Sequence, residues 1–260
     1  MSTIQNVNPL SILALDPGGA KIREDGFSCI KTDNGFELVI VVVIPPIQDL
    51  VEKNIQQCLS SSFIKASRSN SSIQLFQRNN RMEYSLKEGK LRPVLAVKYF
   101  INKDGKIKQR TATKNNAIAI WIDHLAHNEE EMCNNAHKVV KMIHKNHKGG
   151  RRLEKISTRW DKYGISSDQR LSNLLLDLFS FTCREICTIK RVPYYNRGPC
   201  YGDVIVSHPY FGNFNKPMRD VLSLINLLNL HNKILGNDNF LFGEKEMFIT
   251  LNKMHGLIGI

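Results

Sequence analysis

Long hydrophobic runs, a cationic leader and an excess of acidic residues are all missing from this 260-residue sequence. The longest apolar run, Leu38 to Pro46, is far shorter than the roughly 20 residues that a membrane-spanning helix needs. The N-terminal segment has no Arg-rich amphipathic pattern either, so we expect no signal or transit peptide. These absences argue against a membrane protein and a secreted one. We expect an intracellular protein, cytoplasmic rather than organellar, with no membrane partner.

Closely spaced cysteine pairs are also missing. None of the six cysteines forms a Cys-x-x-Cys pair, the spacing that most zinc sites use. Without a secretory signal, the cysteines are expected to be reduced thiols. The sequence therefore indicates neither a zinc site nor a disulfide framework.

Basic residues, in contrast, are abundant: 36 Lys and Arg oppose 24 Asp and Glu, a formal net charge of +12. One interpretation is a protein from a lysine-rich proteome. The other is a polyanionic partner, because each phosphate that a cation neutralises releases condensed counterions. A basic run over residues 138–162 ends in aromatic residues, a combination that suits single-stranded nucleic acid. The residues that we assign to RNA contact are Lys138, Lys141, Lys145, Arg151, Arg152, Arg159, Trp160 and, further along, Arg197.

The hydrophobic pattern predicts strands in the first half of the chain and helices in the second. A hairpin is expected over residues 26–44, with its turn at 33–35 and an apolar second strand that is buried on both faces. A second strand pair is predicted over 93–101 and 106–112. A helix over 48–59 and a loop over 60–80 lie between the two pairs. Helical periodicity covers residues 128–148, 168–190 and 216–235, which makes the fold class α+β, with a single domain.

Three carboxylates stand close together near the N-terminus: Asp16, Glu24 and Asp25, separated by a loop that contains Pro17, Gly18 and Gly19. Carboxylates gathered by a tight loop can hold Mg²⁺, which prefers oxygen ligands and keeps several waters for a phosphate substrate. The alternative is that Glu24 and Asp25 only begin a strand at the surface. The spacing alone favours this alternative.

Four segments, in this order, resemble the catalytic RNB domain of the ribonuclease II family. Residues 15–26 follow its opening motif IDxxxAKDxDDA: Asp16 and Asp25 match the first and last aspartates, and Glu24 stands for the third. Residues 85–92 resemble the SLxPxxxR segment. Residues 171–197 resemble the long central helix and the Tyr-Arg pair that follows it, and residues 214–219 stand where the family has FTSPIRRYxD.

Several positions depart from the family pattern. Ile22 replaces the second aspartate, and an aliphatic side chain can neither bind a metal nor order its water. Leu175 and Leu176 lie near the acidic pair of the central helix, and Asp220 replaces the second arginine of the last motif. The polar residues of the HIADV strand are replaced by the valine-rich run 41–44.

The resemblance implies one RNB-like domain over residues 12–235, with a mixed sheet packed by helices and with extensions over 1–11 and 236–260. In the family, the aspartates hold Mg²⁺ and arginines of the last motif stabilise the phosphate under attack. The resemblance thus implies a vestigial site of Asp16, Glu24, Asp25 and Arg219 that converges on one cavity. Asp16 and Asp25 would hold one weakly bound Mg²⁺ or no cofactor at all.

We therefore favour a catalytically degenerate RNB-fold protein that binds RNA, either alone or within a ribonucleoprotein or nuclease assembly. One alternative is a Mg²⁺-dependent 3′-to-5′ exoribonuclease with an eroded active site. The other is a purely structural subunit of a ribonucleoprotein complex. Ile22 argues against the enzyme, and the positive charge argues against a scaffold that contacts protein alone.

Overall fold

The computed structural model divides the chain into two compact units, Met1–Val43 with Ser85–Phe179, and Ile44–Tyr84 with Ser180–Ile260. The domain boundaries expected from the sequence stay a prediction. The predicted helix over 48–59 and loop over 60–80 lie outside the described residues. Within the described part of the chain, no helix is long and apolar enough to cross a membrane. The structure describes residues 9–14, 22–45, 82–121, 127–146, 167–197, 204–206, 213–218, 220–238 and 240.

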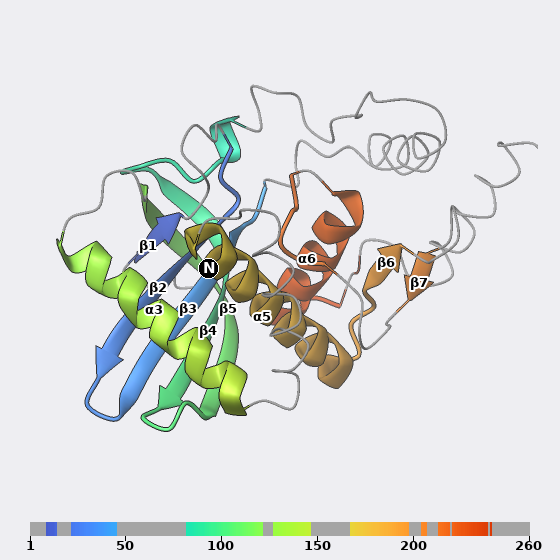
Figure 1. Ribbon diagram of the computed structural model, residues 1–260. Helices are drawn as coiled ribbons and strands as arrows, with labels where there is room; N and C mark the ends of the chain where they lie inside the picture. The colour runs from blue at the N-terminus through green and yellow to red at the C-terminus, as the bar shows by residue number, and fades with distance from the viewer. Residues whose placement is uncertain are drawn as a thin grey trace, which may run out of the picture. The chain divides into compact units, whose positions relative to one another are not determined.

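The first unit is built on a closed five-stranded barrel (Figure 1). Neighbouring strands along the chain pair antiparallel, whereas β1 and β5 close the barrel as a parallel pair. The closing pair is parallel because the first and last strands of a five-strand meander run in the same direction. The strands are β1 (Leu10–Ala14), β2 (Asp25–Thr32), β3 (Gly35–Val43), β4 (Leu91–Asn102) and β5 (Ile107–Trp121).

Both predicted hairpins are confirmed. The turn between β2 and β3 falls at residues 33–34, and Gly35 follows it with a φ of 147°, in the region that favours glycine. Every residue of β3 except Glu37 is buried, as its unbroken apolar run predicted. Sequence reasoning missed β1, and it ended β5 at Ala112, whereas the strand continues to Trp121. The polar stretch Thr113–Asn116 gave no strand signal in the sequence. The strand continues through it because β5 pairs with β4 up to Ile118 and with β1 from Ala117 to Trp121.

The close approach of β1 to β2 requires a glycine at position 26. A Cβ atom added to Gly26 would lie 2.7 Å from the carbonyl oxygen of Leu13 and 3.0 Å from Cδ1 of Ile12. The neighbouring pair, Leu13 with Phe27, is where β1 and β2 are hydrogen-bonded. Only a residue without a side chain fits between the two strands here.

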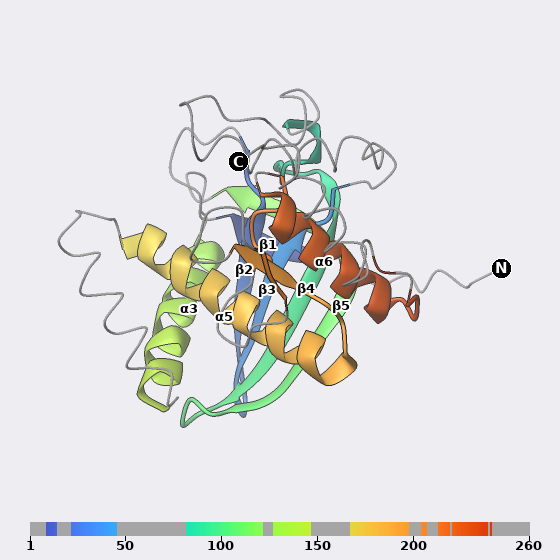
Figure 2. The same ribbon diagram turned by 90° about the vertical axis from the view of Figure 1, so that its right-hand side faces the viewer.

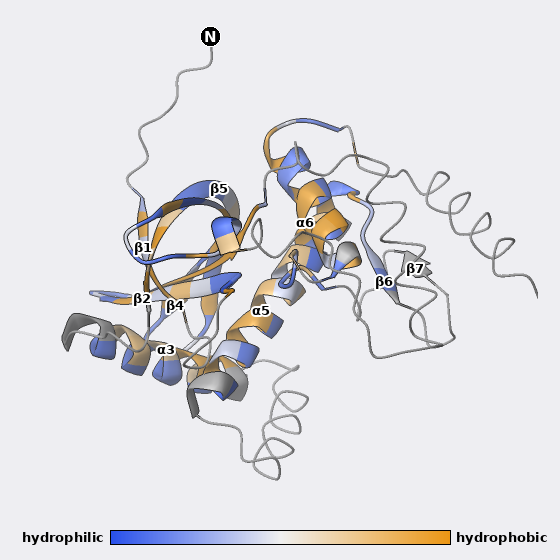
Figure 3. Cartoon of the chain, turned by 90° about the horizontal axis from the view of Figure 1, so that it is seen from above, coloured by the Kyte–Doolittle hydropathy of each residue, from blue (hydrophilic) through white to orange (hydrophobic). Residues whose placement is uncertain are grey.

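The helix α3 (His127–Asn146) packs on β2 and β3, and Figure 2 shows it beside these strands. Its apolar side faces the barrel and its polar side faces outward (Figure 3). Ala136, Val139, Val140 and Ile143 are buried, which agrees with the helical periodicity over 128–148, whereas Lys138 is exposed and stands 5.6 Å over the Phe36 ring.

The helix α5 (Ser167–Lys190) has the predicted limits, and its first half belongs to the first unit. There the Tyr99 hydroxyl of β4 donates to the carbonyl of Leu178 at 3.2 Å. This hydrogen bond fastens the helix to the outer face of the barrel. The apolar centre of the helix is largely buried.

The second unit contains a two-stranded antiparallel ribbon, β6 (Tyr195–Arg197) with β7 (Val204–Val206), and the helix α6 (Val221–Ile234). Residues 216 and 217 were expected to begin this helix because proline is tolerated in a first turn. That expectation is wrong: Asp220 is the N-cap, and its carboxylate accepts from the amide of Ser223 at 3.3 Å. The first amides of a helix need an acceptor from outside the helix. The Asp220 carboxylate supplies one, whereas the side chain of Pro217 has no acceptor atom.

Replacing Gly26 with alanine is expected to destabilise the fold, because the new methyl group meets backbone that cannot move without opening the barrel. The free energy of unfolding should fall by about 1–3 kcal/mol, the usual cost of overpacking. Urea unfolding measures it. Gly89→Asn is the control, because nothing lies within 4 Å of a Cβ there and asparagine tolerates the φ of 63°. Equal effects of the two substitutions would contradict the account of Gly26.

Candidate functional site

Backbone hydrogen bonds hold residues 22–25, here called the acidic segment, where the chain enters β2. The amide of Leu86 donates to the carbonyl of Arg23 at 2.9 Å, and the amide of Val43 donates to that of Glu24 at 2.8 Å. The hydroxyl of Ser85 accepts from the amide of Arg23 at 2.8 Å. Segments far apart in the sequence thereby fix the path of the chain into β2.

Ser85 and Leu86 begin the segment that resembles SLxPxxxR, and Arg92 ends it. The Arg92 guanidinium donates through Nε to the carbonyl of Ser85 at 3.1 Å, so the segment folds back on itself. The structure thus brings the first two family-like segments into contact. Sequence reasoning noted both segments but did not predict this contact, because nothing local links residues about 60 positions apart.

Glu24 and Asp25 are buried, with 0% and 5% of their surfaces exposed, and Arg23 beside them is 1% exposed. The alternative of a surface strand is therefore wrong. Charged side chains are rarely buried unless they are paired, because removal from water costs several kcal/mol for each ion. Arg23, Glu24 and Asp25 each have polar or electrostatic interactions within the protein, and these offset part of the cost.

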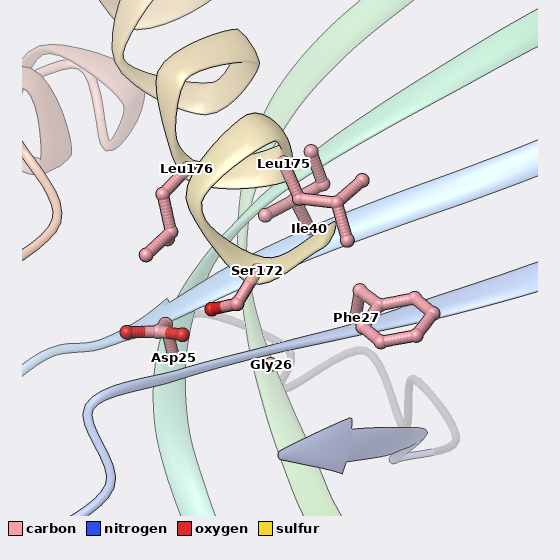
Figure 4. Close-up of a pocket in the computed structure, with 7 residues that line it drawn as sticks. All are labelled: Asp25, Gly26, Phe27, Ile40, Ser172, Leu175 and Leu176. Atoms are coloured by element: carbon pink, nitrogen blue, oxygen red, sulfur yellow. The ribbon is translucent and has the colours of Figure 1, made fainter. Parts of the chain in front are cut away.

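Asp25 borders a small cleft between the barrel and α5 (Figure 4). Asp25 and Phe27 alternate along β2, so they share the barrel face on which Ile40 of β3 also lies. The carboxylate of Asp25 lies next to Ser172 in the close-up. The lining residues from α5 are Ser172, Leu175 and Leu176.

The two leucines stand where the resemblance places acidic residues of the central helix. Among the described residues, no group of three or more His, Cys, Asp or Glu side chains could hold a metal ion. The described part of the cleft offers one carboxylate and one hydroxyl, whereas Mg²⁺ is bound by carboxylates, waters and substrate phosphates in an octahedral shell. Leu175 and Leu176 would exclude water from that shell. These donors do not fit a Mg²⁺ site.

The structure describes only some of the remaining residues that the sequence singled out. Asp16 and Arg219 lie outside the described residues, so their convergence with Asp25 stays a prediction. Ile22 is half-buried at the start of the acidic segment.

The predicted RNA-contact residues are described only in part. Lys138 and Lys141 are exposed on α3. Lys145 lies in α3 and Arg197 in β6. Arg151, Arg152, Arg159 and Trp160 lie outside the described residues.

Asn226 on α6 is a positioning residue that sequence reasoning missed. Its side-chain amide donates to the carbonyls of Tyr195 at 2.8 Å and Asn213 at 3.0 Å, and its oxygen accepts from the amide of Tyr195 at 2.7 Å. The same helix face carries Ser223, whose hydroxyl accepts from the amide of Lys216 at 2.9 Å. This face fixes the loop that begins the last family-like segment. The available signal was the presence of two polar residues, Ser223 and Asn226, three positions apart in an otherwise apolar helix.

Three buried cysteines have weakly acidic thiols. Burial raises the pKa of Cys29 to about 12 and raises the pKa of Cys187 as well. Burial is also the main cause that raises the pKa of Cys183. Neither these three cysteines nor Cys133 takes part in a disulfide, and the reduced state of all six cysteines stays a prediction.

No model of a known protein family matches this sequence, and no curated protein does. Solved structures do match. RNase R from Mycoplasma genitalium in complex with double-stranded RNA has a TM-score of 0.62 at 12% identity, over 96% of this chain and 63% of its own. Yeast Ssd1, described as a pseudonuclease, has a TM-score of 0.67 at 12% identity, over 96% of this chain and 42% of its own.

An active-site mutant of the Dss1 exoribonuclease from Candida glabrata has a TM-score of 0.57 at 12% identity, over 94% of this chain and 42% of its own. All three are RNB-domain proteins. This chain therefore has an α+β RNB-type fold, and the resemblance stated from its motifs is confirmed at the level of the fold. The chain spans less than two thirds of the length of each of these proteins.

The raised thiol pKa values predict slow alkylation of the native protein. At pH 8, Cys29 should be almost entirely protonated, and the thiolate is the reactive form. Iodoacetamide followed by peptide mass spectrometry should label Cys29, Cys183 and Cys187 only after unfolding. The half-buried Cys133 should be labelled faster than Cys29 in the native protein, because its side chain is more accessible. Equal labelling of all four in the native state would contradict the described burial.

Proposed function

We propose that this protein binds single-stranded RNA on an RNB-type fold whose nuclease site no longer catalyses hydrolysis. The observation that carries the proposal is the cleft beside Asp25, where Leu175 and Leu176 take the place of polar groups. Removing one preorganised electrostatic contact typically costs 10²–10³-fold in rate. Several such contacts are changed together here, since Ile22 also replaces a metal-binding aspartate of the family pattern.

RNA binding is supported by charge and by fold. The formal net charge is +12, and Lys138 and Lys141 are exposed on one helix. The structural neighbours include an RNase R bound to double-stranded RNA and a pseudonuclease. A binding module that keeps the fold of a nuclease without its chemistry accounts for both the basic surface and the apolar cleft.

The runner-up is a Mg²⁺-dependent 3′-to-5′ exoribonuclease with an eroded site. Two observations favour it: Asp25 retains a carboxylate at the cleft, and the neighbours include active nucleases. A subunit of a larger ribonucleoprotein or nuclease assembly is the third candidate.

Purified protein is expected to leave a 5′-labelled single-stranded RNA intact in the presence of Mg²⁺, because the changed cleft cannot stabilise the charge that develops at the phosphate. A denaturing gel measures the label over time. Asp25→Asn is the necessary control, since a contaminating nuclease would survive that substitution. Stepwise shortening of the RNA that is abolished in Asp25→Asn would overturn the proposal in favour of the exoribonuclease.

RNA affinity is expected to fall steeply with salt, with a log–log slope of roughly −0.7 for each phosphate contact on a single strand. Fluorescence anisotropy over a salt series measures it. Replacing Arg151 and Arg152 together with alanine should weaken binding about equally for all RNA sequences, as expected for phosphate contacts. Binding that does not respond to salt, or no binding at low salt, would refute a polyanion partner.

A further inference from the structure

A row of side chains crosses four strands near the hairpin turns of the barrel. Ile30 of β2 stands opposite Glu37 of β3. Phe100 of β4 stands opposite Glu37 on one side and opposite Gln109 of β5 on the other. Residues that stand directly opposite in paired strands point to the same face of a sheet. These four residues, here called the cross-strand row, therefore share one face at the end of the barrel where Figure 1 shows the two hairpin turns, away from β1.

The helices cover the opposite face of these strands. Tyr99 and Phe36 are each adjacent to a residue of the cross-strand row, so their side chains point the other way. On that side Tyr99 donates to a carbonyl of α5, and Lys138 of α3 stands over the Phe36 ring. The strand β1 pairs with β5 only from Ala117 onward, beyond the row. Neither these two helices nor β1, as far as the structure describes them, covers the cross-strand row.

The cross-strand row presents an aromatic ring beside an ion pair. Phe100 is 37% exposed. Lys98, two residues before it in β4, lies on the same face. The Lys98 ammonium group lies 2.7 Å from Oε1 of Glu37 and 5.6 Å from the centre of the Phe100 ring. The Glu37 carboxylate has no other partner among the described residues. The ion pair thus fixes an acceptor group near an accessible ring.

The chemistry of the cross-strand row suits a nucleobase. The Glu37 carboxylate repels phosphates and offers only hydrogen-bond acceptors, so its partner must bring N–H donors. Glu37 also separates Ile30 from Phe100, so the row lacks the contiguous apolar patch on which protein partners dock. A base combines a flat face, which stacks on an aromatic ring, with hydrogen-bonding groups along its edge.

Guanine is the base whose edge matches a carboxylate. Its N1–H and its N2 amino group are adjacent donors on the Watson–Crick edge, whereas adenine, cytosine and uracil each present a single donor group there. A carboxylate has about four lone-pair sites. The Glu37 carboxylate can therefore accept from both guanine donors while it remains paired with Lys98.

We propose that the cross-strand row binds a guanine base of single-stranded RNA. The Glu37 carboxylate accepts from N1 and from the N2 amino group of the base. Lys98 holds the carboxylate in place, and Phe100 stacks on the base. The inference rests on the proposed RNA binding and gives it a base preference, which phosphate contacts alone do not provide.

Replacement of guanosine by inosine tests the hydrogen bonding directly, since inosine lacks only the N2 amino group. Fluorescence anisotropy compares oligouridines that carry a single guanosine or a single inosine. The unchanged protein should bind the guanosine strand about 10-fold more tightly, because one hydrogen bond to a charged group is lost with the amino group. Glu37→Gln should abolish this preference, because the amide opposes the second donor. Glu130→Gln, which removes the same charge from an exposed position on α3, should keep the preference.

Phe100→Ala tests the stacking contact. Loss of base stacking should weaken binding of the guanosine strand roughly 5- to 150-fold without changing the salt slope, because the contact is uncharged. Phe100→Tyr, which keeps an aromatic face, should bind as the unchanged protein does. Thermal unfolding of each variant checks that the barrel is intact.

The outcomes separate this inference from the proposed function. If the unchanged protein binds RNA but binds the guanosine and inosine strands equally, the base assignment is overturned and RNA binding stands. The same conclusion follows if Glu37→Gln keeps the preference, or if Phe100→Ala binds the guanosine strand as tightly as the unchanged protein does. If the unchanged protein binds no RNA at low salt, the proposed function fails, and the inference fails with it.

Discussion

Closure of the barrel across Gly26 is the constraint on which the rest of the first unit depends. The strand β1 must lie against the second half of β5 and still touch β2, and it does so at a position where no side chain fits. The acidic segment stands immediately before that position, so its path is determined by the closure. The Ser85 segment then holds it from the other side. Together these contacts bury three consecutive charged residues.

The surroundings of Asp25 support the proposal that this RNB-type fold no longer catalyses hydrolysis. The carboxylate stays at the first residue of β2, where the ladder to Val42 fixes the backbone. The cleft beside it is lined on the helix side by a serine and two leucines. Burial of apolar surface there stabilises the packing of α5 on the barrel, at about 25 cal/mol for each Å² removed from water. For a metal ion and its waters, the described lining offers one carboxylate and one hydroxyl.

Elements with strong local patterns were predictable from the sequence, and elements defined by distant partners were not. The apolar run of β3 and the helical periodicity of α3 carry their own signal, and both were predicted. The five residues of β1 form a strand because β5 offers them a parallel partner more than 100 positions away. Asp220 was treated as a lost arginine of a motif, whereas its local role is to cap α6.

The candidate site was predictable only through the order of family-like segments. Spacing alone favoured a surface position for Glu24 and Asp25, and their burial depends on Ser85, Leu86 and α5, which no local pattern connects to them.

The central claim is that the cleft beside Asp25 has lost its ability to hold a divalent cation. Titration of the purified protein with Mn²⁺, followed by electron paramagnetic resonance of the free ion, tests it most directly. The account predicts that the unchanged protein and Asp25→Asn leave the same concentration of free Mn²⁺ at every step of the titration. Binding of one Mn²⁺ per chain that disappears in Asp25→Asn would contradict it.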